Sequence, residues 1–501
     1  MQLTTENSGQ IALQRGVVNQ ASLSIVAGVG FGCALLFAIT HFGVLTIPVA
    51  LFALLVLPWL CREPFRLYLW LLVTWPLFWF APTFALPAGI PDLRYERVVA
   101  IMVAGLILAG EMLAKRPIPS IGVLAGLAFA CHTIVLLWSL TMSGAARPEL
   151  GDFINFAVLP LTMYWLTKSL ITSREPTKWL LFAIVFMSVF ACCTGVYERA
   201  LGGIENPFSD VKIDDEGSNR LMDVQGGRAS GVFVNPAVFG AVMGIGALAS
   251  VGCLVNARRR LSRLLFSLIT LFLFYGVFIS FTRGAWLAVF LTFFLAQFLF
   301  RDLWKKTLPL FVLGMIVLFA ISGLLAESSV VQDRLLNEEN VVGRVERAIW
   351  CFEQFLEKPV IGWGLNATNE LMGQEFPVSG FRTSHNTFFS MLMDGGLVLF
   401  GSFIAVLVYW LVTATKLLGS RSLDDLQRSV VAVAAGMILI WALCGMNNEL
   451  RYFPYFNSLL WIAGAMIESH RHWASSGDSQ ELAGASNQNG PSEMGAQATL
   501  T

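Results

Sequence analysis

The sequence predicts an all-α protein that crosses a membrane many times. Of its 501 residues, 56% are hydrophobic and only 13% are charged, whereas soluble domains carry roughly 25% charged residues. Apolar runs of about 20 residues recur along the chain, and each is long enough to cross a hydrocarbon layer of about 30 Å. These observations predict a polytopic helical membrane protein with about 12–14 transmembrane helices. The net charge of zero gives no indication of a nucleic-acid partner.

The apolar runs divide the chain into about 14 predicted spans. The third is the weakest, because Pro76 and Pro82 interrupt it. The twelfth is long enough to tilt or to begin outside the bilayer. In chain order the spans are 23–40, 43–60, 67–84, 98–114, 120–142, 153–171, 178–198, 231–256, 264–281, 284–300, 307–326, 387–416, 428–446 and 453–468.

Basic residues predict the orientation, because short cytoplasmic loops carry an excess of Lys and Arg. With the N-terminus inside, every second connection is basic, and residues 258–263 alone hold four Arg. The C-terminus is then also inside. Loops 199–230 and 327–386 share the outer face with the short turn at Arg283.

The predicted organisation follows from these spans and loops. The tail from Ser475 is rich in Ser, Gly, Asn, Gln and Ala, a composition that predicts disorder. The segments are a retained cytoplasmic N-terminus (1–22), a first transmembrane bundle (23–198), an outer loop (199–230), helices around a Thr-Arg-Gly turn (231–326), a large, partly helical outer loop (327–386), the last transmembrane helices (387–468) and a disordered cytoplasmic tail (469–501).

The cysteines and histidines form no metal-binding pattern. No CxxC or HExxH motif occurs, so the sequence predicts no metal site and no cofactor. Cys351 is the only cysteine in an outer loop, and a disulfide framework is therefore not expected. His132 lies in a span, where packing is the favoured interpretation over a proton relay. His385, by contrast, ends the large outer loop.

The large outer loop contains a predicted helix with two arginines on one face. Apolar side chains recur at helical spacing over 345–356, and Pro359 ends the pattern. Arg344 and Arg347 are three residues apart and therefore share a face. They are candidates for a guanidinium clamp on a phosphate or pyrophosphate. The alternative is an interfacial helix whose arginines pair with Glu346 or with lipid headgroups.

Two further arginines lie near predicted helix starts. Arg283 precedes a span directly, so the unpaired N–H groups of that helix would join it in binding an anion; the alternative is an arginine that snorkels to the headgroups. Arg228 precedes the eighth predicted span, in which Asn235 is predicted to be the N-cap and Pro236 to lie in the first turn. Arg228 either adds to the anion site or pairs with Asp223.

His385 is the candidate general base toward a hydroxyl, since the ordinary pKa of histidine is about 6.5. The alternative is a capping or interfacial histidine. Arg382 and Asn386 flank it, and both are candidates for substrate contact. Asp394 lies about two and a half turns farther along the predicted helix. A carboxylate at that depth needs a partner or a water-filled cavity, and it is the last candidate for substrate contact.

The order and spacing of these motifs resemble the O-antigen ligase and O-antigen polymerase superfamily of bacterial envelope proteins. The likeness covers roughly 230–410, about a third of the chain. One departure is that the common Ser-Arg-Gly reads Thr-Arg-Gly here, which keeps the hydroxyl. The matching segments are Arg228…Gly231-Val-Phe-Val-Asn-Pro236, Ser280-Phe-Thr-Arg-Gly-Ala-Trp-Leu-Ala288, Gly343-Arg…Trp350…Pro359-Val-Ile-Gly-Trp-Gly364 and Ser384-His-Asn386…Asp394-Gly-Gly396.

This resemblance implies a metal-independent, inverting glycosyltransferase of GT-C-like architecture in the bacterial inner membrane. Its donor would be a polyprenyl-diphosphate-linked oligosaccharide and its acceptor a saccharide hydroxyl, either on a growing polymer or on a lipid A-core-like molecule, at the periplasmic face. Residues matching Arg283, Arg344 and Arg347 would hold the diphosphate, and the one matching His385 would serve the acceptor. Membrane lipid, a flippase and a chain-length regulator are the other expected partners.

Two other functions stay open from the residues alone. One is a transporter of lipid-linked oligosaccharide; such proteins carry polar residues near the membrane midplane, whereas the polar chemistry here gathers at one face. The other is a non-catalytic component of an envelope polysaccharide assembly. Within the enzyme class the motifs are common to polymerases and ligases. The chain has more spans and a longer tail than the simplest ligases, which favours a polymerase or exopolysaccharide role.

Overall fold

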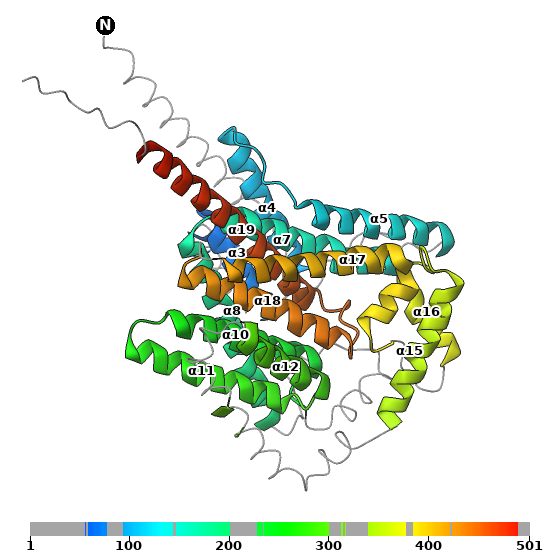
Figure 1. Ribbon diagram of the computed structural model, residues 1–501. Coiled ribbons are helices and arrows are strands. Elements are labelled where there is room, and N and C mark those ends of the chain that lie inside the picture. The colour runs from blue at the N-terminus through cyan, green and yellow to red at the C-terminus, as the bar shows by residue number, and fades with distance from the viewer. Residues whose placement is uncertain are drawn as a thin grey trace, which may run out of the picture. The chain divides into compact units, whose positions relative to one another are not determined.

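All regular elements in the described part of the chain are helices, which confirms the all-α prediction (Figure 1). The computed structural model describes residues 56, 59–77, 94–143, 147–200, 228–233, 235–299, 312–313, 316, 339–376, 384–420 and 423–488. The chain divides into a small unit, Met1–Trp70, and a large one, Leu71–Thr501. In the small unit Arg66 donates to Glu63 at 2.8 Å near the start of α3 (Pro64–Thr74). The helices from α4 onward belong to the large unit.

The helices follow the predicted spans closely where both are described. Within the described residues, six helices are long and apolar enough to cross a membrane, namely α5, α8, α10, α11, α17 and α18, while α3 and α12 are apolar but shorter. The predicted spans 23–40, 43–60 and 307–326 fall wholly or largely outside the described residues. The elements are α3 (Pro64–Thr74), α4 (Tyr95–Leu113), α5 (Val123–Ser143), α6 (Arg147–Phe153), the π-helix η2 (Ile154–Val158), α7 (Leu159–Leu170), α8 (Arg174–Ala200), the 3-10 helix η3 (Gly231–Phe233), α10 (Pro236–Asn256), α11 (Arg260–Ile279), α12 (Arg283–Leu299), α15 (Glu339–Glu357), α16 (Ala367–Glu375), α17 (Thr387–Gly419), α18 (Asp425–Gly445) and α19 (Pro454–Gln488).

Helix α10 is the centre of one group of helices and packs against α8, α11, α12 and α18. It is apolar on every side and almost wholly buried. Gly244 faces Val289 of α12, and Gly246 faces Ser188 of α8, so closely that a Cβ would overlap either neighbour. Small residues permit such close helix contacts where lipid supplies no hydrophobic drive for association. As predicted, Asn235 caps α10 by accepting from the N–H groups of Ala237 and Val238.

A second group joins α7, α17, α18 and α19, and a buried acid ties three of its helices together. Glu468 of α19 is only 6% exposed. It accepts from the Tyr164 hydroxyl at 2.6 Å, from the Lys168 ammonium at 3.3 Å and from the Trp410 indole at 3.0 Å. A buried charge is tolerated only when it is paired and hydrogen-bonded, and these three donors meet that condition.

Helix α17 is sharply bent at Gly396, whose φ of 57° and ψ of −156° are not helical. The chain after α15 fills the bend: the N–H groups of Leu397 and Val398 donate to the carbonyls of Pro359 at 2.9 Å and Val360 at 3.1 Å. The long predicted span 387–416 is therefore two helices, and the part after the bend is itself long enough, at roughly 1.5 Å per residue, to cross a bilayer.

Helix α19 extends beyond the last predicted span and continues to Gln488. The disorder that the sequence predicts from Ser475 stays a prediction. Extending an existing helix costs far less than starting one, so a well-packed helix can carry a poor helix-forming sequence beyond its last packed turn. Residues 489–501 lie outside the described part of the chain.

The bend makes Gly396 intolerant of any side chain. A Cβ there would lie 2.5 Å from the carbonyl carbon and oxygen of Val360, and its backbone conformation is accessible essentially to glycine alone. We expect Gly396→Ala to lower the free energy of unfolding by at least about 3 kcal/mol. Unfolding of the purified protein in mixed detergent–SDS micelles measures this.

The matched control is Gly401→Ala in the same helix, where a Cβ meets nothing within 4 Å. Replacing a helical glycine with alanine at an unstrained position should stabilise by about 0.5–1 kcal/mol. Equal effects of the two substitutions would contradict the bent geometry.

Candidate functional site

The Ser384-His385-Asn386 segment is held to the loop between α18 and α19. Asn386 caps α17 by accepting from the N–H groups of Phe388 and Phe389, while its amide donates to the Met446 carbonyl at 2.9 Å. The next residue, Thr387, donates its hydroxyl to the Asn448 carbonyl at 2.8 Å and accepts from the Leu450 N–H at 2.8 Å. His385 adopts a φ of 54°, a conformation uncommon outside glycine.

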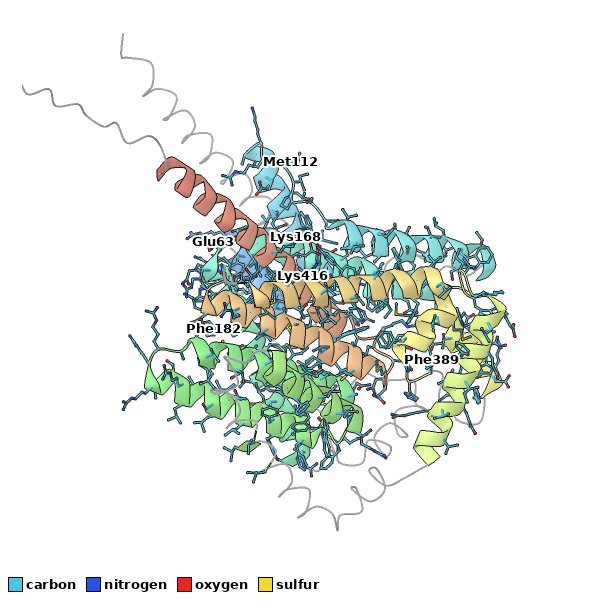
Figure 2. The ribbon with its side chains drawn as sticks, viewed as in Figure 1. Glu63, Met112, Lys168, Phe182, Phe389 and Lys416 are labelled. Carbon is cyan, nitrogen blue, oxygen red and sulfur yellow. The ribbon has the colours of Figure 1, made fainter. Side chains whose placement is uncertain are left out.

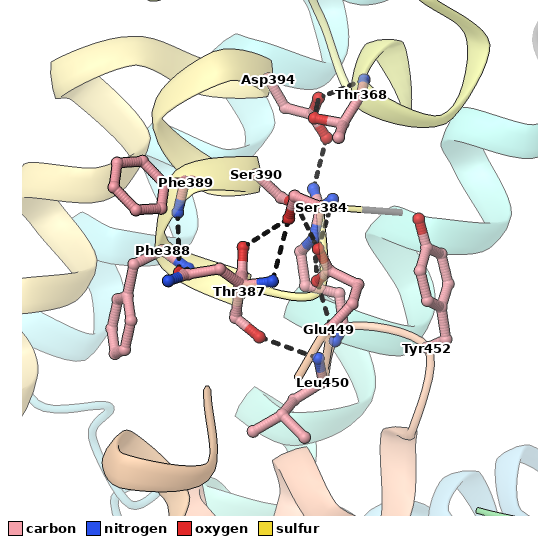
Figure 3. Close-up of polar contacts among 12 residues, drawn as sticks. Thr368, Ser384, Thr387, Phe388, Phe389, Ser390, Asp394, Glu449, Leu450 and Tyr452 are labelled. Carbon is pink, nitrogen blue, oxygen red and sulfur yellow. Dashed lines mark hydrogen bonds and ion pairs between the residues drawn. The ribbon is translucent and has the colours of Figure 1, made fainter. Parts of the chain in front are cut away.

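Beneath this segment lies a buried network of charged groups (Figure 3). Arg451, 8% exposed, contacts the carboxylate of Asp394 and donates its Nε to Glu449 at 2.8 Å. Glu449 also accepts from the Ser390 hydroxyl. Burial alone would lower the pKa of Arg451, but the carboxylates of Glu449 and Asp394 outweigh burial and raise it. The arginine is therefore fully charged between two acids.

Ser384 connects this network to the backbone around the histidine. Its hydroxyl lies 2.6 Å from the hydroxyl of Ser390, accepts from the Asn386 N–H at 3.0 Å and lies 2.8 Å from the Asn386 carbonyl. His385 is the residue between these two. Its backbone is thus fixed on both sides by groups that lead to Glu449 and Arg451.

Asp394 is an internal hub. It is fully buried and accepts from the Thr368 N–H at 2.7 Å, the Thr368 hydroxyl at 2.6 Å and the Asn366 N–H at 3.2 Å, in addition to Arg451. Its backbone carbonyl accepts from the Gly364 N–H at 2.8 Å. Asp394 therefore joins the start of α16 and the turn after α15 to the first part of α17.

Arg344 and Arg347 of α15 lie close enough to His385 to change its protonation. Burial first, and the positive charges of Arg344 and Arg347 second, lower the pKa of His385 to about 4. Arg347 is buried. Arg344 is exposed as a whole residue, yet protein surrounds its guanidinium enough that desolvation lowers its pKa, followed by the charges of Arg347 and Arg283.

Arg283 begins α12, and the turn before it is held from two sides. Arg228 donates its Nε and Nη2 to the Phe281 carbonyl at 3.3 and 3.2 Å. The guanidinium of Arg199 lies 4.7 Å from the centre of the Phe281 ring. Phe281 has a positive φ of 42°. These contacts fix the Thr282-Arg283-Gly284 turn, whose arginine faces the charge of Arg344.

The arrangement combines several guanidinium groups with a neutral imidazole. Arg283, Arg344 and Arg347 present positive charge from two different helices, and a phosphate or diphosphate placed among them would relieve their mutual repulsion. His385 is uncharged near neutral pH, so its imidazole can accept a proton. An anion-binding site beside a proton acceptor is suited to transfer reactions in which a diphosphate leaves and a hydroxyl attacks.

The predicted site residues thus take different places. The structure brings His385, Arg283, Arg344 and Arg347 together electrostatically, and Arg228 supports the Arg283 turn. Asn386 acts as an N-cap, and the oxygens of Asp394 are engaged inside the protein, so neither presents a free polar group. Arg382 lies outside the described residues.

Sequence reasoning missed Glu449 and Arg451. They stand in Asn447-Asn448-Glu449-Leu450-Arg451-Tyr452, a short polar connection between the last two spans on the same predicted face as His385. The presence of a Glu and an Arg in so short a connection was the sequence signal that could have identified them as site residues. Their partner Asp394 is distant in sequence, and no local pattern connects them.

Removing the charge of Asp394 should loosen the whole site. Asp394→Asn leaves Arg451 buried with one acid fewer, and we expect a loss of about 3 kcal/mol in the free energy of unfolding. Asp425→Asn, at an exposed position in the first turn of α18, should cost less than about 1 kcal/mol. Unfolding in detergent–SDS mixtures compares the two; similar losses would exclude a special role for the buried carboxylate.

The lowered pKa of His385 has a measurable consequence. Its folded pKa, about 4, lies below the unfolded value of about 6.5. The unfolded chain therefore binds more protons between these values, and the stability due to neutral His385 is present above pH 6.5 and lost as the pH falls toward 4. Activity that needs the neutral imidazole should show no inflection near pH 6.5.

Arg344→Gln removes one of the charges that lower this pKa, so the acid limb of the pH–rate profile should move toward higher pH. Glu353→Gln, an exposed change on the same helix, is the control and should leave the limb in place. A limb at the same pH in wild type and Arg344→Gln would contradict the proposed electrostatic coupling.

Comparison with known families yields one match in the region just described. Residues 268–404 match the O-antigen ligase family model. The matched segment runs from within α11 to within α17 and contains Arg283, Arg344, Arg347, His385 and Asp394. A search of curated proteins finds no match to this chain. The family match confirms the resemblance to the O-antigen ligase and polymerase superfamily over residues 268–404, and the long apolar helices are those of a membrane protein.

Proposed function

We propose that the protein transfers a glycan from a polyprenyl diphosphate to an acceptor hydroxyl at the periplasmic face of the bacterial inner membrane. The observation that carries this proposal is the electrostatic convergence of Arg283 and Arg344 with His385 inside a segment of the O-antigen ligase type. Glycan transfer is the general activity of that family; donor, acceptor and membrane face are our proposal.

In the proposed reaction the acceptor oxygen attacks the anomeric carbon of the donor sugar. The bond between that carbon and the diphosphate oxygen breaks, and the polyprenyl diphosphate leaves with the bonding electrons. The acceptor proton passes to the neutral imidazole of His385. The negative charge that grows on the leaving group is stabilised by Arg283, Arg344 and Arg347, which act without a metal. Attack opposite the leaving group inverts the anomeric centre.

The residues around these four would act as positioning groups. Arg228 holds the turn that carries Arg283, and Asn386 starts the helix that follows His385. Asp394 holds Arg451, which in turn holds Glu449 under Ser384. We therefore propose a positioning role for Asp394 and Asn386 in place of direct substrate contact. Arg382 stays a candidate for contact with the glycan.

An apolar surface next to the arginines supports a lipid-linked donor. One side of α15 exposes Val345, Ile349, Phe352 and Leu356, opposite the side that carries Arg347. This row continues into Val360 and Leu397, both more than half exposed, at the bend of α17. An amphipathic helix of this kind is typical of a membrane surface, so the polyprenyl chain can stay in lipid while its diphosphate reaches the guanidinium groups.

The transporter and scaffold alternatives lack a comparable observation. In the described residues, the groups suited to chemistry gather at one end of the helices, around His385. A flippase would supply the donor, and a chain-length regulator would act on the product if the enzyme is a polymerase. Both are proposed partners.

Replacing His385 tests the proposal and separates polymerase from ligase. In the native host, His385→Ala should abolish product at normal membrane levels, because the acceptor then lacks its base. Accumulation of single lipid-linked repeat units identifies a polymerase, and accumulation of long lipid-linked chains identifies a ligase. Profiling polyprenyl-linked glycans by length measures both.

The control is Glu353→Ala, an exposed change on α15 that should leave the glycan profile unchanged. An unaltered profile in His385→Ala, at wild-type protein levels, would remove the histidine from the reaction and favour transport or scaffolding.

A further inference from the structure

A hollow lies at the opposite end of the helices from His385. It is a cavity of ≈ 490 Å³ formed where α8, α11 and α18 begin and where α10 ends. The same helices have their other ends near the site: Glu198 of α8 accepts from Ser230 at 2.9 Å, and Asn386 contacts Met446 after α18. Because α11 is 20 residues long, roughly 30 Å separate the two ends. The cavity is therefore distinct from the candidate active site.

The inner wall of the cavity is apolar. Leu181 and Phe182 of α8 and Phe266 of α11 contribute to it, with Cys253 of α10. The rings of Phe182 and Phe266 are nearly parallel, with centres 6.0 Å apart, and Phe182, which is labelled in Figure 2, is 37% exposed. Exposed aromatic rings at the end of membrane-spanning helices offer a surface for an alkyl chain.

The rim of the cavity is basic. Arg174, Lys178 and Arg258 all line it. Arg174 is 3.6 Å from Asp424, and its side chain is still 57% exposed; Lys178 contacts Glu175 one turn away. Arg258 is exposed and precedes Arg259 in the connection, and Arg260 and Arg263 follow at the start of α11. Cations outnumber acids among the residues that line the cavity. Exposed ion pairs such as Arg174–Asp424 and Lys178–Glu175 contribute little energy, so the acids bind these cations only weakly.

One helix start adds to the positive potential. Helix α11 begins at this cavity with no side-chain cap and no acid in its first turn, so its start carries a partial positive charge, whereas the starts of α8 and α18 carry Glu175 and Asp425. An anionic headgroup is favoured by the basic side chains and by the start of α11 together, whereas a zwitterionic headgroup brings a cation of its own.

We propose that this cavity binds one anionic phospholipid. Its phosphate would lie among Arg174, Lys178 and Arg258, and one acyl chain would lie along Phe182 and Phe266. The site is on the face that the sequence predicts to be cytoplasmic, and it is independent of the proposed glycan transfer.

Native mass spectrometry of the full chain in detergent tests this proposal. The protein is titrated with phosphatidylglycerol and, separately, with phosphatidylethanolamine of the same acyl chains. We expect one phosphatidylglycerol to bind at least tenfold more tightly. The double variant Arg174→Ala/Arg258→Ala should weaken that binding on the order of tenfold or more, since each cation near a lipid surface changes the affinity by about fivefold. The control is Lys115→Ala/Arg116→Ala, an exposed basic pair after α4 that does not line the cavity.

Three results would overturn the proposal. Equal affinity for the two lipids would exclude charge selection. Equal losses in the cavity variant and the Lys115/Arg116 control would show a general surface effect. Inorganic phosphate that competes as well as the lipid, with the same dependence on Arg174 and Arg258, would show a site for a free anion. Both variants change exposed residues, and their thermal unfolding in detergent confirms that they fold.

Discussion

The buried charge of Arg451 is the constraint on which the site depends. A guanidinium that is almost fully removed from water is stable only with close acids and saturated hydrogen bonds, and here Asp394 and Glu449 supply both. The two acids come from different elements, so meeting the needs of one cation fixes the loop after α18 against the first part of α17. Glu449 extends this constraint through Ser390 and Ser384 to the backbone of His385. The backbone of the histidine is thus positioned through hydrogen bonds that lead to this buried charge.

The Asp394 carboxylate also fixes the position of α16 and of the turn that precedes it. Asp394 receives donors from Asn366 and Thr368, and its carbonyl receives Gly364, so α16 and the turn before it can be in one place only. The bend at Gly396 lets the chain after α15 enter α17 at Pro359 and Val360. This contact holds α15 where the charge of Arg347 contributes to the lowered pKa of His385. A flexible loop would lose conformational entropy each time it assembled such a cluster around a substrate. In this fold that entropy is lost once, on folding, and substrate binding is not weakened by it.

The rigid fold also holds arginines that repel one another close together. Arg344 feels the charges of Arg347 and Arg283, and burial, followed by the charges of Arg344 and Arg347, lowers the pKa of His385 and keeps it neutral. Stability supplied by the apolar helices and by the Arg451 network holds these like charges near one another. A bound diphosphate would turn the repulsion into attraction, and the attraction would grow as charge moves onto the leaving group. The cavity at the other end of α8, α11 and α18 also gathers positive charge, but on exposed side chains around an apolar wall, which suits a resident lipid more than a reacting group.

Much of the fold follows from the sequence alone, because the cost of leaving backbone groups unpaired in lipid makes any long apolar run a helix. That local rule predicted the spans, while helical spacing predicted the amphipathic helix with Arg344 and Arg347 and residue preference predicted the Asn235 cap. The candidate anion-binding residues and His385 were also identifiable, since each stands at the edge of an apolar run on one predicted face. The bend at Gly396, the pairing of Asp394 with Arg451 and the depressed pKa of His385 were not, because each depends on groups that are distant in sequence and meet only after packing. The sequence by itself determined which segments are apolar enough to form membrane-spanning helices and which residue types lie at their ends. Only the tertiary structure decided which of those residues lie close together, because a buried charge pairs with groups that are near it in space, whatever their separation in sequence.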